Sequence, residues 1–152
     1  MINEKLHVLF HDLTGAIGGI NTLSQICAAY ITQFNLEKLE GKFKNEITKN
    51  LKNLLAYRKS VGEKFNLVMD TLIEIGERDI AVALQKDVLQ EVEKIKDLEA
   101  GTDLLYSRLL KDDTKDNLYC FSKEVSEFKT VCDSMMKIIT DCRNKLTVLG
   151  KY

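Results

Sequence analysis

Apolar residues recur along the chain at alternating spacings of four and three, which is typical of helices that bury one face. Two segments keep this pattern without interruption. The members of the first are Ile2, Leu6, Leu9, Leu13, Ala16, Ile20, Leu23, Cys27, Tyr30 and Phe34. The members of the second are Leu118, Phe121, Val125, Phe128, Cys132, Met135, Ile139, Cys142, Leu146 and Leu149. The pattern therefore predicts a long helix at each end of the chain.

Two further segments lie between these and keep the same spacing with a few polar interruptions. Arg58 interrupts one segment, and Glu91 and Thr102 interrupt the other. Both segments are also expected to form long helices. Their apolar members are Ile47, Leu51, Leu54, Val61, Phe65, Val68, Leu72 and Ile75, and then Ala81, Leu84, Val88, Ile95, Leu98, Leu105 and Leu109.

Short breaks separate the four predicted helices. The first falls at Asn35, the second at residues 76–79 and the third at residues 111–114. Gly76 suits a helix C-terminus, and Asp113 or Thr114 can cap the helix that follows. Two more places can break or kink a helix. They are the capping-box sequence of Ser60 to Glu63 and the pair Gly101-Thr102.

Short connections between helices of similar length favour antiparallel neighbours. We therefore expect an all-α fold, an antiparallel up-down-up-down four-helix bundle with long helices. The chain has 152 residues, which suits one domain with a buried core. A single helical-bundle domain over residues 1–152 is the predicted organisation.

Composition narrows the function classes. The chain has no proline, the residue that most often breaks a helix, so long uninterrupted helices are permitted. Its 22 Lys and Arg balance 23 Asp and Glu, which argues against a nucleic-acid-binding protein; the basic stretch 49–59 is interpreted as a solvated helix face. No segment approaches the ~18 apolar residues of a membrane span, and the N-terminus lacks a signal-peptide layout. We expect a cytoplasmic protein that binds neither nucleic acid nor membrane.

Three of the four cysteines fall on the apolar stripes: Cys27, Cys132 and Cys142. The cysteine spacings contain no C-x-x-C pair, so a zinc site is not indicated. A free cysteine on a core position acts as a small hydrophobe. We predict that these three thiols pack in the core.

His11 lies between two inward-facing leucines and therefore on the outward side of the first helix. Other residues of that face follow from helical geometry. Three glycines come soon after the histidine, although glycine weakens a helix by about 1 kcal/mol relative to alanine. Close approach of a partner to the imidazole ring is an adequate reason for them. The residues sharing the face are His7, Thr14, Gly15 and Gly18, and Gly19 follows them.

The segment HDLTGAIGGI, residues 11–20, resembles the phospho-acceptor motif of two-component phosphorelays. It is similar to the H-box of sensor histidine kinases in its histidine, the acid after it, the leucine at plus two, and apolar residues at plus six and plus nine. It is similar to histidine phosphotransfer domains at Leu13, Gly15 and Ala16, while Thr14 stands where lysine is usual. Both families carry the histidine on an exposed helix face of a four-helix bundle.

The resemblance implies a function. His11 is the expected phospho-acceptor, and Asp12 is expected to orient or deprotonate the ring. The docking surface for a response-regulator receiver domain comprises His7, Thr14, Gly15 and Gly18. No glycine-rich ATP-binding domain follows, so the phosphoryl group is expected from another protein. We expect no cofactor in this chain, because Mg²⁺ would be supplied by the receiver partner.

Two other interpretations stay open. The first is a non-catalytic helical scaffold, adaptor or oligomeric interaction module, in which His11 is incidental and Gly15 and Gly18 permit close packing of helices. Either a monomer or a homodimer is compatible with the pattern. The second is a metal site on His7 and His11 with Asp12 or Glu4 nearby. The sequence offers no H-E-x-x-H motif and no third strong ligand, so no metal is predicted.

Overall fold

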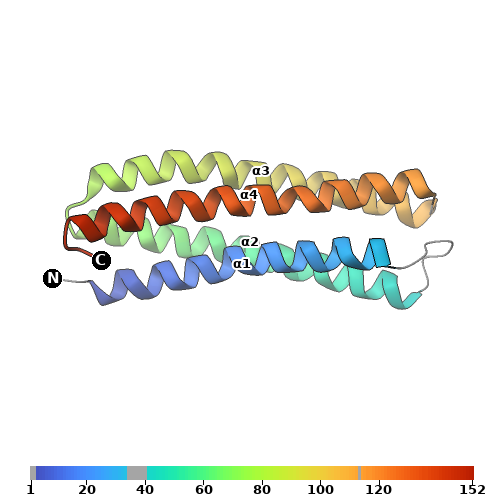
Figure 1. The fold of residues 1–152 in the computed structure, drawn as a ribbon, viewed down its shortest axis with the longest axis horizontal. Coiled ribbons are helices and arrows are strands. Elements are labelled where there is room, and N and C mark those ends of the chain that lie inside the picture. The colour runs from blue at the N-terminus through green and yellow to red at the C-terminus, as the bar shows by residue number, and fades with distance from the viewer. Residues whose placement is uncertain (1–2, 34–40, 113) are drawn as a thin grey trace.

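The computed structural model describes residues 3–33, 41–112 and 114–152, with side chains described for 3–29, 45–112 and 114–152. It contains four helices: α1 (Glu4–Gln33), α2 (Gly41–Glu74), α3 (Arg78–Lys111) and α4 (Lys115–Val148). They lie side by side along one long axis (Figure 1). The predicted all-α fold, a bundle of four long helices, is confirmed.

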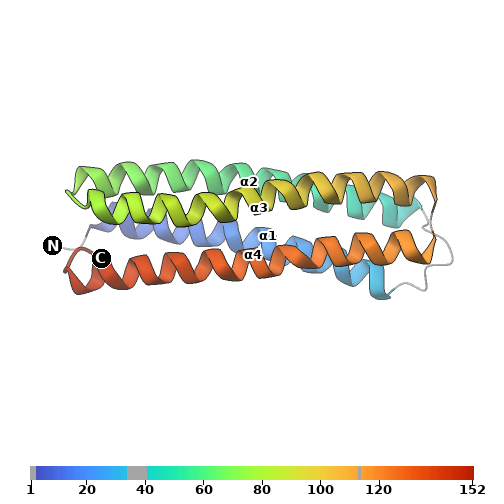
Figure 2. The ribbon, with the colours of Figure 1, turned by 90° about the horizontal axis from the view of Figure 1, so that it is seen from above.

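Successive helices run in opposite directions along the axis (Figures 1 and 2). At the end that holds both chain termini, Lys5 at the start of α1 forms an ion pair with Glu74 at the end of α2, 3.7 Å apart. At the other end, the hydroxyls of Thr48 in α2 and Tyr106 in α3 are hydrogen-bonded at 2.8 Å. Helix α1 packs against α2 and α4, and α3 packs against α4 and α2.

The buried side chains form a large cluster towards the end with the termini and a smaller one towards the other end. The smaller cluster comprises Cys27, Ile47, Tyr106, Leu109, Leu118, Phe121 and Val125. The predicted stripes supply most of the described core. Ile2, Tyr30 and Phe34 lie outside the described side chains.

The core departs from the predicted stripes in both directions: one stripe residue is exposed, and several residues outside the stripes, including Met69, Tyr106 and Val131, are buried. Leu149 is 51% exposed, because α4 ends at Val148 and Leu149 lies in the turn that follows the helix. Phe10 and Ile17 are fully buried although the stripe leaves them out. Helix α1 contacts two neighbouring helices, so its buried face is wider than a strict stripe.

Of the three polar interruptions of the stripes, Glu91 and Thr102 are buried and Arg58 is half-buried. Glu91 and Thr102 are 6% and 1% exposed, and Glu91 accepts a hydrogen bond from Lys94 at 3.0 Å. Arg58 pairs with Glu99 across the α2–α3 interface, with 2.6 Å between Nε and Oε2. These interruptions therefore mark positions where polar side chains lie between the helices.

A glycine follows the C-terminus of both α2 and α4. The sequence predicts the first of these, Gly76. Gly76 has φ +82°; its N–H donates to the Ile73 carbonyl, and the Glu77 N–H donates to the Leu72 carbonyl at 2.9 Å. This pair of bonds is the Schellman arrangement, which favours a residue without Cβ. Gly150, with φ +72°, repeats it after α4.

The other predicted boundaries have mixed outcomes. Thr114 caps α4, since its hydroxyl accepts the Asn117 N–H at 3.2 Å; the predicted break at Asn35 lies outside the described residues. Helices α2 and α3 continue through Ser60 and Gly101, so neither helix breaks there. Buried stripe residues on both sides hold these helices, and packing outweighs a local capping signal.

The cysteine prediction is confirmed. Cys27, Cys132 and Cys142 are buried free thiols, and Cys120 is exposed. Burial raises the pKa of Cys27 to about 11, of Cys132 to about 12 and of Cys142 to about 11. At neutral pH these three groups are thiols that pack as apolar side chains.

Within the described ranges, none of the helices contains an apolar stretch long enough to cross a membrane.

Candidate functional site

His11 lies on the outward face of α1 with its imidazole exposed. The neighbouring side chains Leu9, Phe10 and Leu13 are buried and hold this part of α1 against the rest of the bundle. The imidazole is therefore solvent-accessible, as expected, and the helix that carries it is anchored from its other side.

The three glycines near His11 have different surroundings. A Cβ added at Gly15 or Gly18 would meet no heavy atom within 4 Å, whereas one at Gly19 would lie 2.5 Å from Cε1 of Tyr57. Gly19 thus makes room for the Tyr57 ring of α2. Gly15 and Gly18 are exposed, and no other helix of the bundle requires them, so packing within the chain does not explain them.

Thr14 lies one turn beyond His11 and is half-buried. Its hydroxyl donates a hydrogen bond to the His11 carbonyl oxygen at 2.9 Å. This bond fixes the Thr14 side chain against its own helix. The hydroxyl oxygen still has acceptor capacity, so it can bind a partner's donor beside the imidazole.

The structure does not bring Asp12 into contact with the His11 ring. The Asp12 carboxylate lies 3.8 Å from the ammonium nitrogen of Lys64 in α2. No hydrogen bond or ion pair between the side chains of Asp12 and His11 is present in the described part of the chain. Consecutive residues of a helix point about 100° apart, so Asp12 faces α2 while His11 faces solvent.

His7 contacts the last residue of the chain. Its ring centroid lies 4.8 Å from that of Tyr152. Tyr152 also meets Phe10 edge-on at 5.5 Å, and the Arg143 guanidinium lies 5.0 Å from the Tyr152 ring centroid. His7 and His11 are both exposed, but the ring of His7 packs against Tyr152. The surroundings of the two histidines therefore differ.

Sequence reasoning missed both Lys64 and Tyr152. Each meets α1 from a different part of the chain, and neither contact leaves a periodic or local signal that could have revealed it. The alternative metal site on His7 and His11 gains no third ligand from the structure, because no group of three His, Cys, Asp or Glu side chains within the described ranges is arranged to hold a metal ion.

A shallow groove of about 650 Å³ adjoins the open face where α1 meets α2. Gly18, Gly19 and Thr22 form its α1 side, and Asn53 and Tyr57 belong to its α2 side. The accessible surface beside His11 therefore continues from the glycines into a depression between two helices.

The chain matches no protein-family model, no curated protein and no solved structure.

The different surroundings of the glycines give a stability prediction. Gly15→Ala and Gly18→Ala should each raise the free energy of unfolding by about 0.5–1 kcal/mol, because alanine is the better helix former and its methyl group meets no neighbour. Gly19→Ala should give no such gain, since the Tyr57 ring must move. Urea denaturation followed by circular dichroism measures all three.

A matched background checks the cause. In a Tyr57→Ala chain, Gly19→Ala should recover the gain seen at Gly15. A loss of stability in Gly15→Ala that grows with protein concentration would contradict an open face and indicate that another copy packs there.

Proposed function

We propose that this chain is a histidine phosphotransfer protein that relays a phosphoryl group between His11 and the aspartates of response-regulator receiver domains. The observation that carries the proposal is the exposed imidazole beside Gly15 and Gly18, where the space around both glycines is empty. The motif resemblance of residues 11–20 supports the same function. A relay of this kind operates in the cytoplasm.

The chemistry is a phosphoryl transfer through a phosphohistidine. The lone pair of a neutral His11 ring nitrogen attacks the phosphorus of the receiver's aspartyl phosphate. The new P–N bond forms as the P–O bond to aspartate breaks, and the aspartate leaves as a carboxylate. The proton on the other ring nitrogen passes to water, and the reverse reaction delivers the group to a second receiver.

Positioning and charge neutralisation supply most of the catalysis in such transfers. The receiver's Mg²⁺ neutralises the phosphoryl oxygens, and this chain contributes an exposed imidazole on a helix that is anchored from its other side. Lys64 brings an ammonium group to Asp12, next to His11 in the sequence, and so adds a cation at the α2 side of the face. Asp12 acts in this proposal by holding Lys64 there.

Docking uses the surface that the glycines leave open. A helix of the receiver domain can lie along Gly15 and Gly18 and enter the groove beside Thr22. No side chain has to move away, which keeps the imidazole accessible to the in-line approach that phosphoryl transfer requires.

Transfer of label tests the proposal. Receiver domains carrying ³²P on their aspartate are mixed with the wild type, His11→Gln and the matched control His7→Gln. We expect acid-labile label on the wild type and on His7→Gln, and none on His11→Gln. Equal labelling of wild type and His11→Gln, or no labelling of any chain by a panel of receivers, would overturn the proposal.

The second candidate is a non-catalytic helical interaction module. Val8 is 56% exposed and lies one turn before His11, so an apolar side chain and two bare glycines line the same face. That surface suits a partner helix or a second copy of the chain without any phosphoryl chemistry. In this case His11→Gln would retain partner binding, whereas Val8→Asp and Gly15→Leu would lose it.

A further inference from the structure

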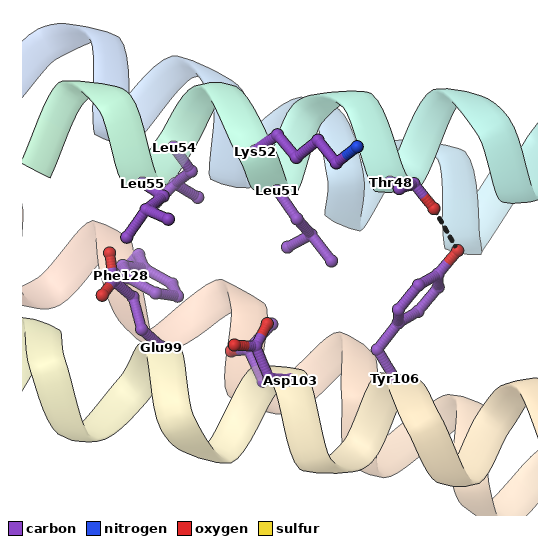
Figure 3. A pocket seen from close by; sticks show the side chains of 10 residues that line it. Thr48, Leu51, Lys52, Leu54, Leu55, Glu99, Asp103, Tyr106 and Phe128 are labelled. Carbon is purple, nitrogen blue, oxygen red and sulfur yellow. Dashed lines mark hydrogen bonds between the residues drawn. The ribbon is translucent and has the colours of Figure 1, made fainter.

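The interface of α2 and α3 contains a pocket that the proposed phosphotransfer does not use (Figure 3). Its volume is about 300 Å³, which is within the range of small-molecule sites. The hydrogen-bonded hydroxyls of Thr48 and Tyr106 lie at one end of it, and Phe128 and Glu99 lie at the other. Side chains of three helices, α2, α3 and α4, therefore bound the pocket along its length.

The body of the pocket is apolar. Leu51, Leu54 and Leu55 line it from α2, and the ring of Phe128 lines it from α4. Phe128 and Leu54 are 1% and 2% exposed, so these walls belong to the core, while Leu55 is exposed at the rim. An alkyl chain or an aromatic ring could cover these surfaces and displace water from them.

The α3 side carries hydrogen-bonding groups without partners. Thr102 lines the pocket and is 1% exposed, yet its hydroxyl makes no hydrogen bond among the described residues. The Oε1 atom of Glu99 is likewise buried without a partner, while Oε2 binds Arg58. Buried polar atoms are normally hydrogen-bonded, so these two point to a ligand that donates hydrogen bonds.

The negative charges on the α3 side of the pocket indicate that the hydrogen-bond donor of the ligand is a cation. Glu99 and Asp103 are one helical turn apart on α3, and both line the pocket. Each can accept hydrogen bonds from a cation, and Thr102 can accept one more. Lys52 lines the opposite rim on α2 and makes no ion pair with either carboxylate among the described residues. A compact ammonium group has three donors for these three acceptors.

We propose that the α2–α3 pocket binds a small primary amine with an apolar body. The ammonium group lies against Glu99, Thr102 and Asp103, and the apolar body lies between the α2 leucines and Phe128. The ligand class follows from two buried acceptors without partners and a neighbouring carboxylate, all beside an apolar cavity. The proposal stands independently of phosphoryl transfer, because none of these residues belongs to the His11 face.

Nuclear magnetic resonance titration of the full chain tests this. The probe is 2-phenylethylamine, and the comparison compound is 3-phenylpropionate, which keeps the ring and replaces the ammonium by a carboxylate. We expect saturable amide shifts around residues 51–55 and 99–106 with the amine only. Asp103→Asn and Thr102→Val should weaken binding by roughly tenfold or more, the effect of losing a hydrogen bond to a charged group.

Asp97→Asn serves as the matched control, since it removes the same charge from α3 at a residue that does not line this pocket. It should bind the amine as tightly as the wild type. Equal binding of both compounds, shifts located elsewhere, equal weakening by Asp97→Asn and Asp103→Asn, or no saturable shift with millimolar amine would each overturn the proposal. Circular dichroism verifies that the variants fold.

Discussion

Replacement of Phe10 by alanine is expected to lower the free energy of unfolding by about 3–5 kcal/mol, as large-to-small changes of a buried phenylalanine do. Phe10 is fully buried in the larger core cluster, and its ring meets Tyr152 edge-on. Alanine leaves a cavity where α1 packs on the bundle and removes the ring that supports the C-terminal residue. Urea denaturation measures the loss.

Val8→Ala is the matched control, because Val8 lies two residues before Phe10 on the same helix and is 56% exposed. It should change stability by no more than about 0.5 kcal/mol. Phe10→Leu should fall between the two. A cost below about 1 kcal/mol for Phe10→Ala would contradict the placement of this ring in the core.

Replacement of Arg58 by methionine is the second large effect, expected to cost about 3 kcal/mol at pH 7. Breaking a buried ion pair leaves the remaining charge without compensation. The side chains of Arg58 and Glu99 are 24% and 17% exposed, so the loss is expected at the lower end of the range for buried pairs. Denaturation at pH 7 and pH 4 measures it.

The pH dependence of this cost has a definite sign. Burial raises the pKa of the Glu99 carboxyl above its usual value of 4.5, and Arg58 opposes that rise. The folded chain therefore holds this proton more tightly than the unfolded chain, and stability falls as pH increases above about 4.5. Without Arg58 the fall is steeper, so Arg58→Met should cost more at pH 7 than at pH 4.

A double variant separates charge from packing. Arg58→Met combined with Glu99→Leu removes both charges and should recover most of the lost stability, as apolar replacements of buried ion pairs do. A cost of Arg58→Met that is the same at both pH values and unchanged by Glu99→Leu would show that the ion pair does not determine it.

The helices were predictable because their signal is local. Leu9 and Leu13 alternate with polar residues at the helical period, so their burial and the exposure of His11 follow from one count. Arg58 was predicted only as an interruption of an apolar stripe, although a charge at such a position needs a partner. Which residue supplies it was not readable: Glu99 meets Arg58 only through the packing of α2 on α3.

The surroundings of the candidate site were less predictable for the same reason. Gly15, Gly18 and Gly19 look alike in sequence, and only the position of Tyr57 on α2 distinguishes Gly19 from the other two. The partners of Asp12 and His7 are Lys64 and Tyr152. Such contacts depend on the register between helices, which helical periodicity does not fix.

The central claim is that His11 carries the phosphoryl group, and mapping the modified residue tests it most directly. The chain is incubated with a phosphorylated receiver domain, kept at alkaline pH to preserve phosphohistidine, digested and analysed by tandem mass spectrometry. We predict phosphate on His11 and on no other residue, lost after brief acid treatment. Phosphate on His7, acid-stable phosphate on a hydroxyl residue, or an unmodified chain would contradict the account.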